Sequence, residues 1–210
     1  MIPPDDVLDL DILLTADGST ASKVICDLSG GPCSHAAPLI RLDGVARLVE
    51  PTFKSYGKPT VNRLSDRLRE YARAPGGCVW QLRLADPLNP MEAADLRVRL
   101  LDWVSRGDNY SLFGAMASAF ACWTNRRGKA GRFCSSLCAR ELRHFGRLPL
   151  AVNCNEVTPI NLPEADIWAW CKQLVGEPTE LPQLNSVPLS QFAWWVTADR
   201  KTRRVGVWRP

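Results

Sequence analysis

The dipeptide Asp43-Gly44 is the feature that most restricts how this chain can fold, because it separates two apolar runs, 35–42 and 45–50. Asp-Gly between such runs is the strongest short signal for a two-residue β-hairpin turn, in which both central residues adopt positive φ angles. The turn also fixes the pairing register, since the residues on its two sides face each other. The sequence therefore predicts an antiparallel strand pair with a locally determined register.

That register brings a histidine and a glutamate to the same face of the hairpin. Ala37 faces Glu50, and two residues further from the turn His35 faces Thr52. Because side chains alternate between faces, His35 and Glu50 become diagonal neighbours, about 5–8 Å apart at Cβ. A carboxylate within reach of an imidazole holds one tautomer and stabilises its charged form, which the general base of a thiol requires.

A candidate nucleophile follows much later in the chain, at Cys134, where a helix is predicted to begin. A thiol at a helix start lies among unpaired N–H groups and the positive end of the helix dipole, which favour the thiolate. The basic loop 126–132 acts in the same direction. The chain has two histidines. His144 lies too far along the same helix to reach back, so His35 is the candidate base.

These residues, in this order, resemble the permuted papain-like cysteine hydrolases of the NlpC-type superfamily, in its YiiX-like branch. The resemblance covers about residues 8–163, and one departure is Ser136, where many relatives carry an acidic residue. The cysteine follows the histidine here, as in the permuted branch. The segments that carry the resemblance are Asp11-Ile12-Leu13-Leu14, Ser34-His35, Val49-Glu50, Phe133-Cys134-Ser135 and Thr158-Pro159-Ile160-Asn161-Leu162.

The resemblance implies an α+β papain-like fold in circularly permuted order, with an antiparallel sheet packed against helices and a C-terminal extension. It implies Cys134 as nucleophile, His35 as base and Glu50 as the residue that orients the base. Tyr110 is similar to a tyrosine that these proteins place near the site, and we expect it and Ser135 to contact substrate.

The implied activity is hydrolysis of an amide bond through an acyl-enzyme, without a cofactor. Cell-wall (peptidoglycan) stem peptides are the leading substrate class that the resemblance implies, followed by acylated small molecules, lipids, esters and thioesters. A competing interpretation is a non-catalytic structural or assembly protein, for example of a phage tail, that retains the hydrolase fold.

Each site residue also has a purely structural interpretation. Buried cysteines are common and inert, so Cys134 can be a packing residue, as we expect for Cys138 one turn later. Glu50 can be a charged strand end, and Tyr110 an ordinary core or loop residue. The case for a site therefore depends on the combination of Cys134 with His35 and Glu50.

The eight cysteines show no paired spacing, which indicates free thiols in a reducing compartment. Cys26, Cys33 and His35 are close in sequence, but without a CxxC pair or a second histidine motif we expect no metal site.

The net charge of +4 is small. The helix predicted at 60–71 carries arginines spaced to pair with Asp66 and Glu70, and no aromatic residues lie between them, so we expect a solvated helix face and no nucleic-acid partner. The arginines in and just after that stretch are Arg63, Arg67, Arg69 and Arg73.

The apolar run 112–123 is too short to span a membrane. The acidic N-terminus lacks the profile of a signal peptide, so we expect synthesis in the cytoplasm. A wall-cleaving enzyme would then be delivered to the envelope by a phage particle, a secretion device or lysis.

Periodicity predicts the remaining elements of the first part of the chain, residues 1–163. We expect strands at 7–14 and 78–84, and helices at 21–28, 60–71, 90–104, 112–123 and from 134 to near Gly146.

The second part, residues 164–210, has a different composition. We expect a short helix at 164–174, a proline-rich linker at 176–188, and two strands at 191–197 and 203–208. The strands would carry three tryptophans, Trp194, Trp195 and Trp208. These either pack back on the same domain or dock residues 177–210 onto a protein partner, since aromatic residues are favoured at interfaces.

Overall fold

An antiparallel sheet of six strands, in the order β4-β3-β2-β1-β5-β6, forms the framework of the part of the chain that the structure describes. The computed structural model describes residues 6–51, 58–107, 134–181 and 183–204. The strands are β1 (Ile12–Ala16), β2 (His35–Leu42), β3 (Val45–Pro51), β4 (Pro59–Arg63), β5 (Cys78–Leu84) and β6 (Trp168–Val175). The helices are α1 (Thr20–Ser29), α2 (Leu64–Arg73), α3 (Pro90–Arg106), α5 (Cys134–His144) and α6 (Leu189–Arg204).

Several predicted features lie outside the described residues. They are the helix at 112–123, Tyr110, the basic loop 126–132 and the end of the last predicted strand, with Trp208.

The predicted hairpin is confirmed. Asp43 and Gly44 adopt positive φ angles of 50° and 74°, as a two-residue turn between twisted strands requires. β2 and β3 pair with Leu42 opposite Val45 and, further from the turn, with Leu39 opposite Leu48. The turn chemistry of two residues thus determines the register of the whole strand pair.

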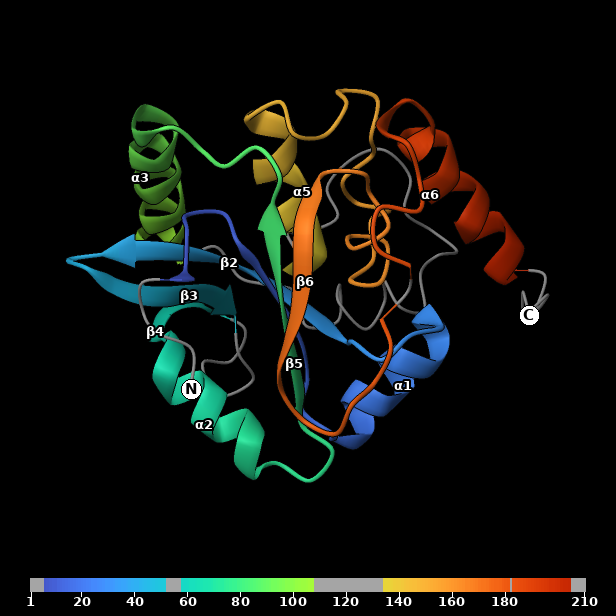
Figure 1. Cartoon of the computed structure of the whole chain (residues 1–210), viewed down its shortest axis with the longest axis horizontal. Helices are drawn as coiled ribbons and strands as arrows, with labels where there is room; N and C mark the ends of the chain where they lie inside the picture. Colours follow the sequence, from blue (N-terminus) through green and yellow to red (C-terminus); the bar gives the residue numbers. More distant parts are fainter. Residues whose placement is uncertain (1–5, 52–57, 108–133, 182, 205–210) are drawn as a thin grey trace.

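The sheet separates two layers of helices (Figure 1). On one face, residues such as Ile12 and Ile40 pack against α3, α5 and α6 in the larger core cluster. On the other face, alternate residues such as Leu13 and Leu48 pack against Leu64 and Tyr71 of α2. In Figure 1, α3, α5 and α6 occupy the upper part of the view, and α1 and α2 the lower part. The result is an α+β fold, as expected.

The helices at 21–28, 90–104 and 134–146 are confirmed, with ends that follow local capping rules. α3 begins with Pro90 after Asn89, whose side chain accepts hydrogen bonds from the backbone of the first turn. The Glu92 carboxylate in turn accepts a hydrogen bond from the Asn89 backbone N–H. Gly146, at a φ angle of 73°, follows the end of α5. None of the helices within the described ranges is long and apolar enough to cross a membrane.

The first strand begins later than the predicted start at residue 7. Leu10 adopts a positive φ angle of 68°, and the Asp11 carboxylate accepts a hydrogen bond of 2.9 Å from the Leu8 backbone N–H. This local turn interrupts the extended backbone, so β1 starts only at Ile12.

The prediction of a single helix at 60–71 is wrong in its first turn. Residues 59–63 form β4, which pairs with β3 so that Thr60 lies opposite Glu50 and Asn62 opposite Leu48. Without β4, one edge of β3 would have unpaired backbone N–H and C=O groups. Pairing of residues 59–63 with this edge is preferred to a helical turn, and the helix starts only at Leu64.

The prediction of a helix at 164–174 is also wrong, because β6 occupies most of this segment. β6 pairs antiparallel with β5, which places Cys171 opposite Leu82. Trp168 is held from two sides: its indole N–H donates to the Leu162 carbonyl at 2.6 Å, and its backbone N–H donates to Asn185 Oδ1 at 3.0 Å. Pairing with a distant strand outweighs the local helical pattern here.

The two strands predicted at 191–197 and 203–208 are replaced, as far as Arg204, by the helix α6. Phe192 and Val196 lie four residues apart and are both buried, with Trp195 packed beside them. This spacing corresponds to one face of a helix. The aromatic and β-branched residues of this segment are typical of strands, which explains why the sequence predicted strands here.

Residues after position 163 share the larger core cluster with residues before it, since Trp168, Phe192 and Val196 pack there with Leu10. The Trp195 indole N–H donates to Glu164 at 3.0 Å. Trp194, by contrast, is 68% exposed. The division at residue 163 and the docking of 177–210 onto a partner stay predictions.

The two aromatic residues of α6 should differ in their effect on stability. Phe192→Ala should lower the free energy of unfolding by about 3–5 kcal/mol, because it empties a fully buried site. Trp194→Ala, on the exposed side of the same helix, should change it by less than about 0.5 kcal/mol. Urea unfolding of both variants measures the difference, and equal effects would contradict this packing of α6.

Candidate active site

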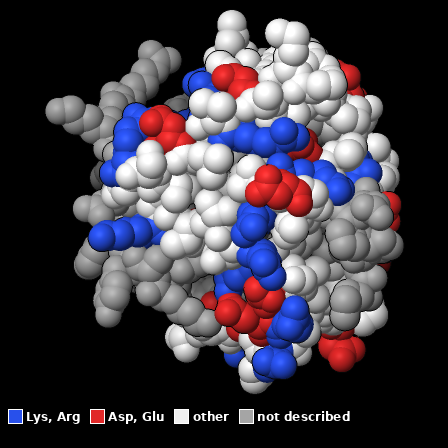
Figure 2. Space-filling model, turned by 90° about the vertical axis from the view of Figure 1, so that its left-hand side faces the viewer, with Lys and Arg blue, Asp and Glu red and all other residues white. Residues whose placement is uncertain are grey.

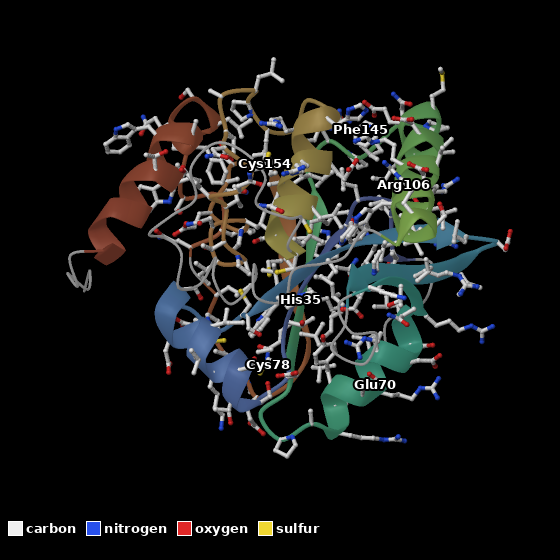
Figure 3. The ribbon with its side chains drawn as sticks, turned by 180° about the vertical axis from the view of Figure 1, so that it is seen from behind. His35, Glu70, Cys78, Arg106, Phe145 and Cys154 are labelled. Carbon is white, nitrogen blue, oxygen red and sulfur yellow. The ribbon has the colours of Figure 1, made fainter. Side chains whose placement is uncertain are left out.

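His35 is the first residue of β2, and its ring lies at the end of that strand, between α5 and the α2 layer. The imidazole Nε2 lies 3.0 Å from Oε2 of Glu50 on β3. The His35 side chain is 19% exposed and that of Glu50 only 1%. In Figure 3, His35 is at the centre of the molecule, near the end of α5 that lies opposite to Phe145. The hairpin register predicted this pairing of His35 with Glu50.

Cys134 is the first residue of α5, the helix that packs against β2, and is 6% exposed. A side-chain hydrogen bond links His35 to Cys134. Because Nε2 of His35 is bonded to Glu50, Nδ1 is the ring nitrogen that remains for the thiol. The three residues singled out in the sequence are thus in contact, in the order Cys134, His35, Glu50.

The surroundings of His35 favour its charged form. Burial disfavours the imidazolium and lowers the pKa, but the charge of Cys134 and the hydrogen bonds to Cys134 and Glu50 outweigh burial and raise the pKa of His35 to about 10. A histidine with such a pKa carries a proton at neutral pH. An imidazolium beside a cysteine stabilises the thiolate.

Glu50 has further partners on the side away from His35. Its Oε1 accepts a hydrogen bond of 2.5 Å from Nε of Arg67 and one of 3.4 Å from Nδ2 of Asn62. Burial raises the pKa of Glu50, yet its interactions with His35 and Arg67 bring the pKa below its ordinary value. The carboxylate therefore stays ionised although it is almost fully buried.

The sequence did not identify Arg67 as part of this site. We had expected its helix face to be solvated, but the Arg67 side chain is only 15% exposed. Arg69 does follow the expectation: it is 63% exposed and pairs with Asp66. A signal was present in the four-residue spacing from Arg67 to Tyr71, a side chain suited to the buried face of α2.

Figure 2 shows basic side chains alternating with acidic ones over one face of the molecule, rather than one uniform patch. The pairs that the structure defines include Arg97 with Asp9 and Arg106 with Asp102. Because positive and negative side chains are paired, the electrostatic potential over this face is not predominantly of one sign.

The other expected site residues are placed differently. The Ser135 side chain is buried, and its hydroxyl donates to the Val157 carbonyl at 2.7 Å. Tyr110 lies outside the described residues. His144 is in the last turn of α5, where it pairs with Asp95 at 3.2 Å, far along the helix from Cys134.

The segment 158–162 forms a hydrogen-bonded turn that contacts the residues before β2. Asn161 Oδ1 accepts hydrogen bonds from the Thr158 backbone at 3.0 Å and from its hydroxyl at 2.7 Å. Ile160 packs so closely on Gly31 that a Cβ atom there would come within 2.1 Å of it. Gly31 lies just before β2, so this contact supports the start of the strand that carries His35.

The remaining described thiols differ from Cys134 in their surroundings. Cys33 and Cys138 are fully buried, and burial raises the pKa of each well above its ordinary value. Within the described ranges, no group of three or more histidine, cysteine or acidic side chains is arranged to hold a metal ion.

Comparison with known proteins shows a likeness in fold. The chain matches no family model and no curated protein sequence. Among solved structures it is similar to the crystal structure of the metalloprotein YiiX from Escherichia coli O157:H7, of the group DUF1105. The TM-score is 0.50 with 16% identical residues, over 65% of this chain. The chain spans 65% of the length of YiiX, and the likeness concerns the fold.

The His35 ring allows a direct test of the charge state at the site. In NMR titrations, the His35 ring should titrate near pH 10, and its pKa should fall toward the ordinary 6.5 in Glu50→Gln, because that variant removes the carboxylate. A wild-type His35 that titrates near 6.5 would contradict this electrostatic account.

Proposed function

We propose that this chain is a cysteine hydrolase in which Cys134 is the nucleophile, His35 the acid–base residue and Glu50 the residue that orients His35. The observation that carries the proposal is the contact of His35 with both others: a hydrogen bond to Cys134 on one side and a 3.0 Å contact with Glu50 on the other. Acyl transfer requires a nucleophile in contact with a base, and a third group in contact with the other side of that base. The fold likeness to YiiX is compatible with this arrangement.

In the proposed reaction, the Cys134 sulfur attacks the carbonyl carbon of an amide, and the carbonyl oxygen becomes negatively charged. Backbone N–H groups at the start of α5 are suited to stabilise this oxyanion. The C–N bond then breaks as His35 gives its proton to the leaving amine, which produces a thioester and a free amine. Water, deprotonated by His35, attacks the thioester and releases a carboxylic acid and the thiol.

Ser135 contributes to this scheme through its backbone rather than its side chain. The Ser135 hydroxyl donates a hydrogen bond of 2.7 Å to the Val157 carbonyl, so this hydroxyl is not directed at a substrate. The hydrogen bond instead fixes the first turn of α5, and with it the direction of the N–H groups beside Cys134. Tyr110 remains a candidate substrate contact on the resemblance alone.

Amide bonds of cell-wall stem peptides are the leading substrate class in this proposal. Esters and thioesters follow, because the same acyl-enzyme forms from them. Hydrolysis of purified peptidoglycan, synthetic stem peptides and aryl thioesters, compared at equal enzyme concentration, distinguishes these classes. No turnover of any of them, with an unreactive Cys134, would favour the competing interpretation of a structural or assembly protein.

The nucleophile assignment predicts selective chemistry at one of the eight cysteines. Near neutral pH a small alkylating agent should label Cys134 first, because His35 stabilises its thiolate while burial suppresses ionisation of Cys33 and Cys138. Intact-mass analysis followed by peptide mapping measures the order of labelling.

Cys134→Ala should abolish turnover and leave the unfolding transition largely intact, and Cys138→Ala is the matched control from the same helix. Faster labelling of Cys33 or Cys138 would overturn the assignment.

The proposal also predicts the alkaline limit of activity. His35 must carry a proton to release the leaving amine, so the rate of acylation should fall as pH rises through about 10 and His35 loses that proton. In Glu50→Gln the fall should begin at lower pH, because the imidazolium loses its carboxylate partner. Single-turnover rates across the pH range measure both, and an unchanged limit in the variant would contradict the role of Glu50.

A further inference from the structure

Arg67 on α2 contacts three different groups with its three guanidinium nitrogens. Its Nε donates to Glu50 Oε1 at 2.5 Å, its Nη2 donates to the Tyr71 hydroxyl at 3.1 Å, and its Nη1 pairs with Glu70. The guanidinium also lies over the Tyr71 ring, 4.9 Å from the ring centroid. A planar group held on all sides in this way has little freedom to rotate.

These contacts tie Arg67 to the strands on both sides of His35. In the sheet, β2 lies between β3 and β1. Arg67 reaches β3 through Glu50, and it reaches β1 through Tyr71, whose hydroxyl accepts a hydrogen bond of 2.9 Å from Thr15. Thr15 is the residue that pairs with His35 between β1 and β2. Arg67 thus connects two residues that both lie next to His35, namely Glu50 on β3 and, through Tyr71, Thr15 on β1.

The two oxygens of Glu50 are used for different purposes. Oε2 meets His35 at 3.0 Å, and Oε1 meets Arg67 at 2.5 Å. A carboxylate held by both oxygens cannot turn about its terminal torsion. Arg67, with the longer contact of Asn62 at 3.4 Å, therefore determines the direction in which Oε2 points. A lysine has no such fork and would hold the carboxylate only as a point charge.

We propose that Arg67 is a positioning residue for the candidate site, which keeps the Glu50 carboxylate charged and aimed at His35. This role rests on the proposed function, because it assigns Arg67 to the same site. Arg67 acts through Glu50 and does not touch the thiol.

The charged and titratable groups around Glu50 come from several elements. His35 lies on β2, Arg67, Glu70 and Tyr71 on α2, and Cys134 on α5. Of the α2 groups, only Arg67 brings a positive charge to Glu50. Its removal therefore leaves His35 as the single described cation that compensates this buried carboxylate.

The test uses the full chain and the NMR signals of the His35 ring. When Glu50 takes up a proton at acid pH, it loses its charge interaction with His35, and the His35 signals show an acid inflection. In Arg67→Met this inflection should move up by about one pH unit or more, because the carboxylate has lost its guanidinium partner. Arg67→Lys should give a smaller shift in the same direction, since it restores the charge without the fork.

Arg69→Met is the matched control, because Arg69 lies on the exposed side of the same helix and pairs with Asp66. It should leave the inflection unchanged. In the Glu50→Gln background, Arg67→Met should no longer alter the His35 signals, because the proposed effect passes through Glu50. A purely structural role of Arg67 would instead perturb His35 in both backgrounds.

An acid inflection that stays at its wild-type pH in folded Arg67→Met overturns the positioning role. If that variant does not fold, Arg67→Lys decides, and an inflection equal to that of the wild type overturns the role in the same way. Neither result depends on turnover. If Cys134 is not labelled before the other cysteines, the proposed function is overturned while the inflection data remain valid. The two failures are therefore distinguishable.

Discussion

The carboxylate of Glu50 is almost fully buried, and a buried charge is costly unless opposite charges and hydrogen bonds compensate it. His35 and Arg67 supply that compensation from two sides. This requirement links three elements, since β2, β3 and α2 must come together for the charge to be tolerated. The inward direction of the Arg67 side chain and the orientation of the imidazole therefore have the same electrostatic cause.

The candidate site lies where the two layers of the fold meet. His35 and Glu50 belong to the sheet, Arg67 comes from the α2 layer, and Cys134 begins the helix α5 of the other layer. His35 connects these layers because it is the first residue of β2, at the end of the strand. The surrounding contacts, such as Ile160 on Gly31, hold the backbone before this strand.

The C-terminal segments show why local pattern was a poor guide after residue 163. Trp168 lies in a strand and Phe192 in a helix, the reverse of what the local composition predicted. β6 exists because β5 offers it a partner edge, and α6 because Phe192 and Val196 find a common core. Both causes lie outside the segments themselves, and tertiary contacts therefore overrode their intrinsic preferences.

The sequence by itself determined the features that depend on short-range geometry. Asp43-Gly44 set the register that brings Glu50 beside His35, and the predicted helix starts at Cys134, because turns and helix ends depend on a few adjacent residues. Only the tertiary structure decided that α5 meets β2 at His35 and that Arg67 turns inward to Glu50. Those contacts depend on how distant segments share one core, and the local pattern of charges on α2 led to the same expectation for Arg67 as for the exposed Arg69.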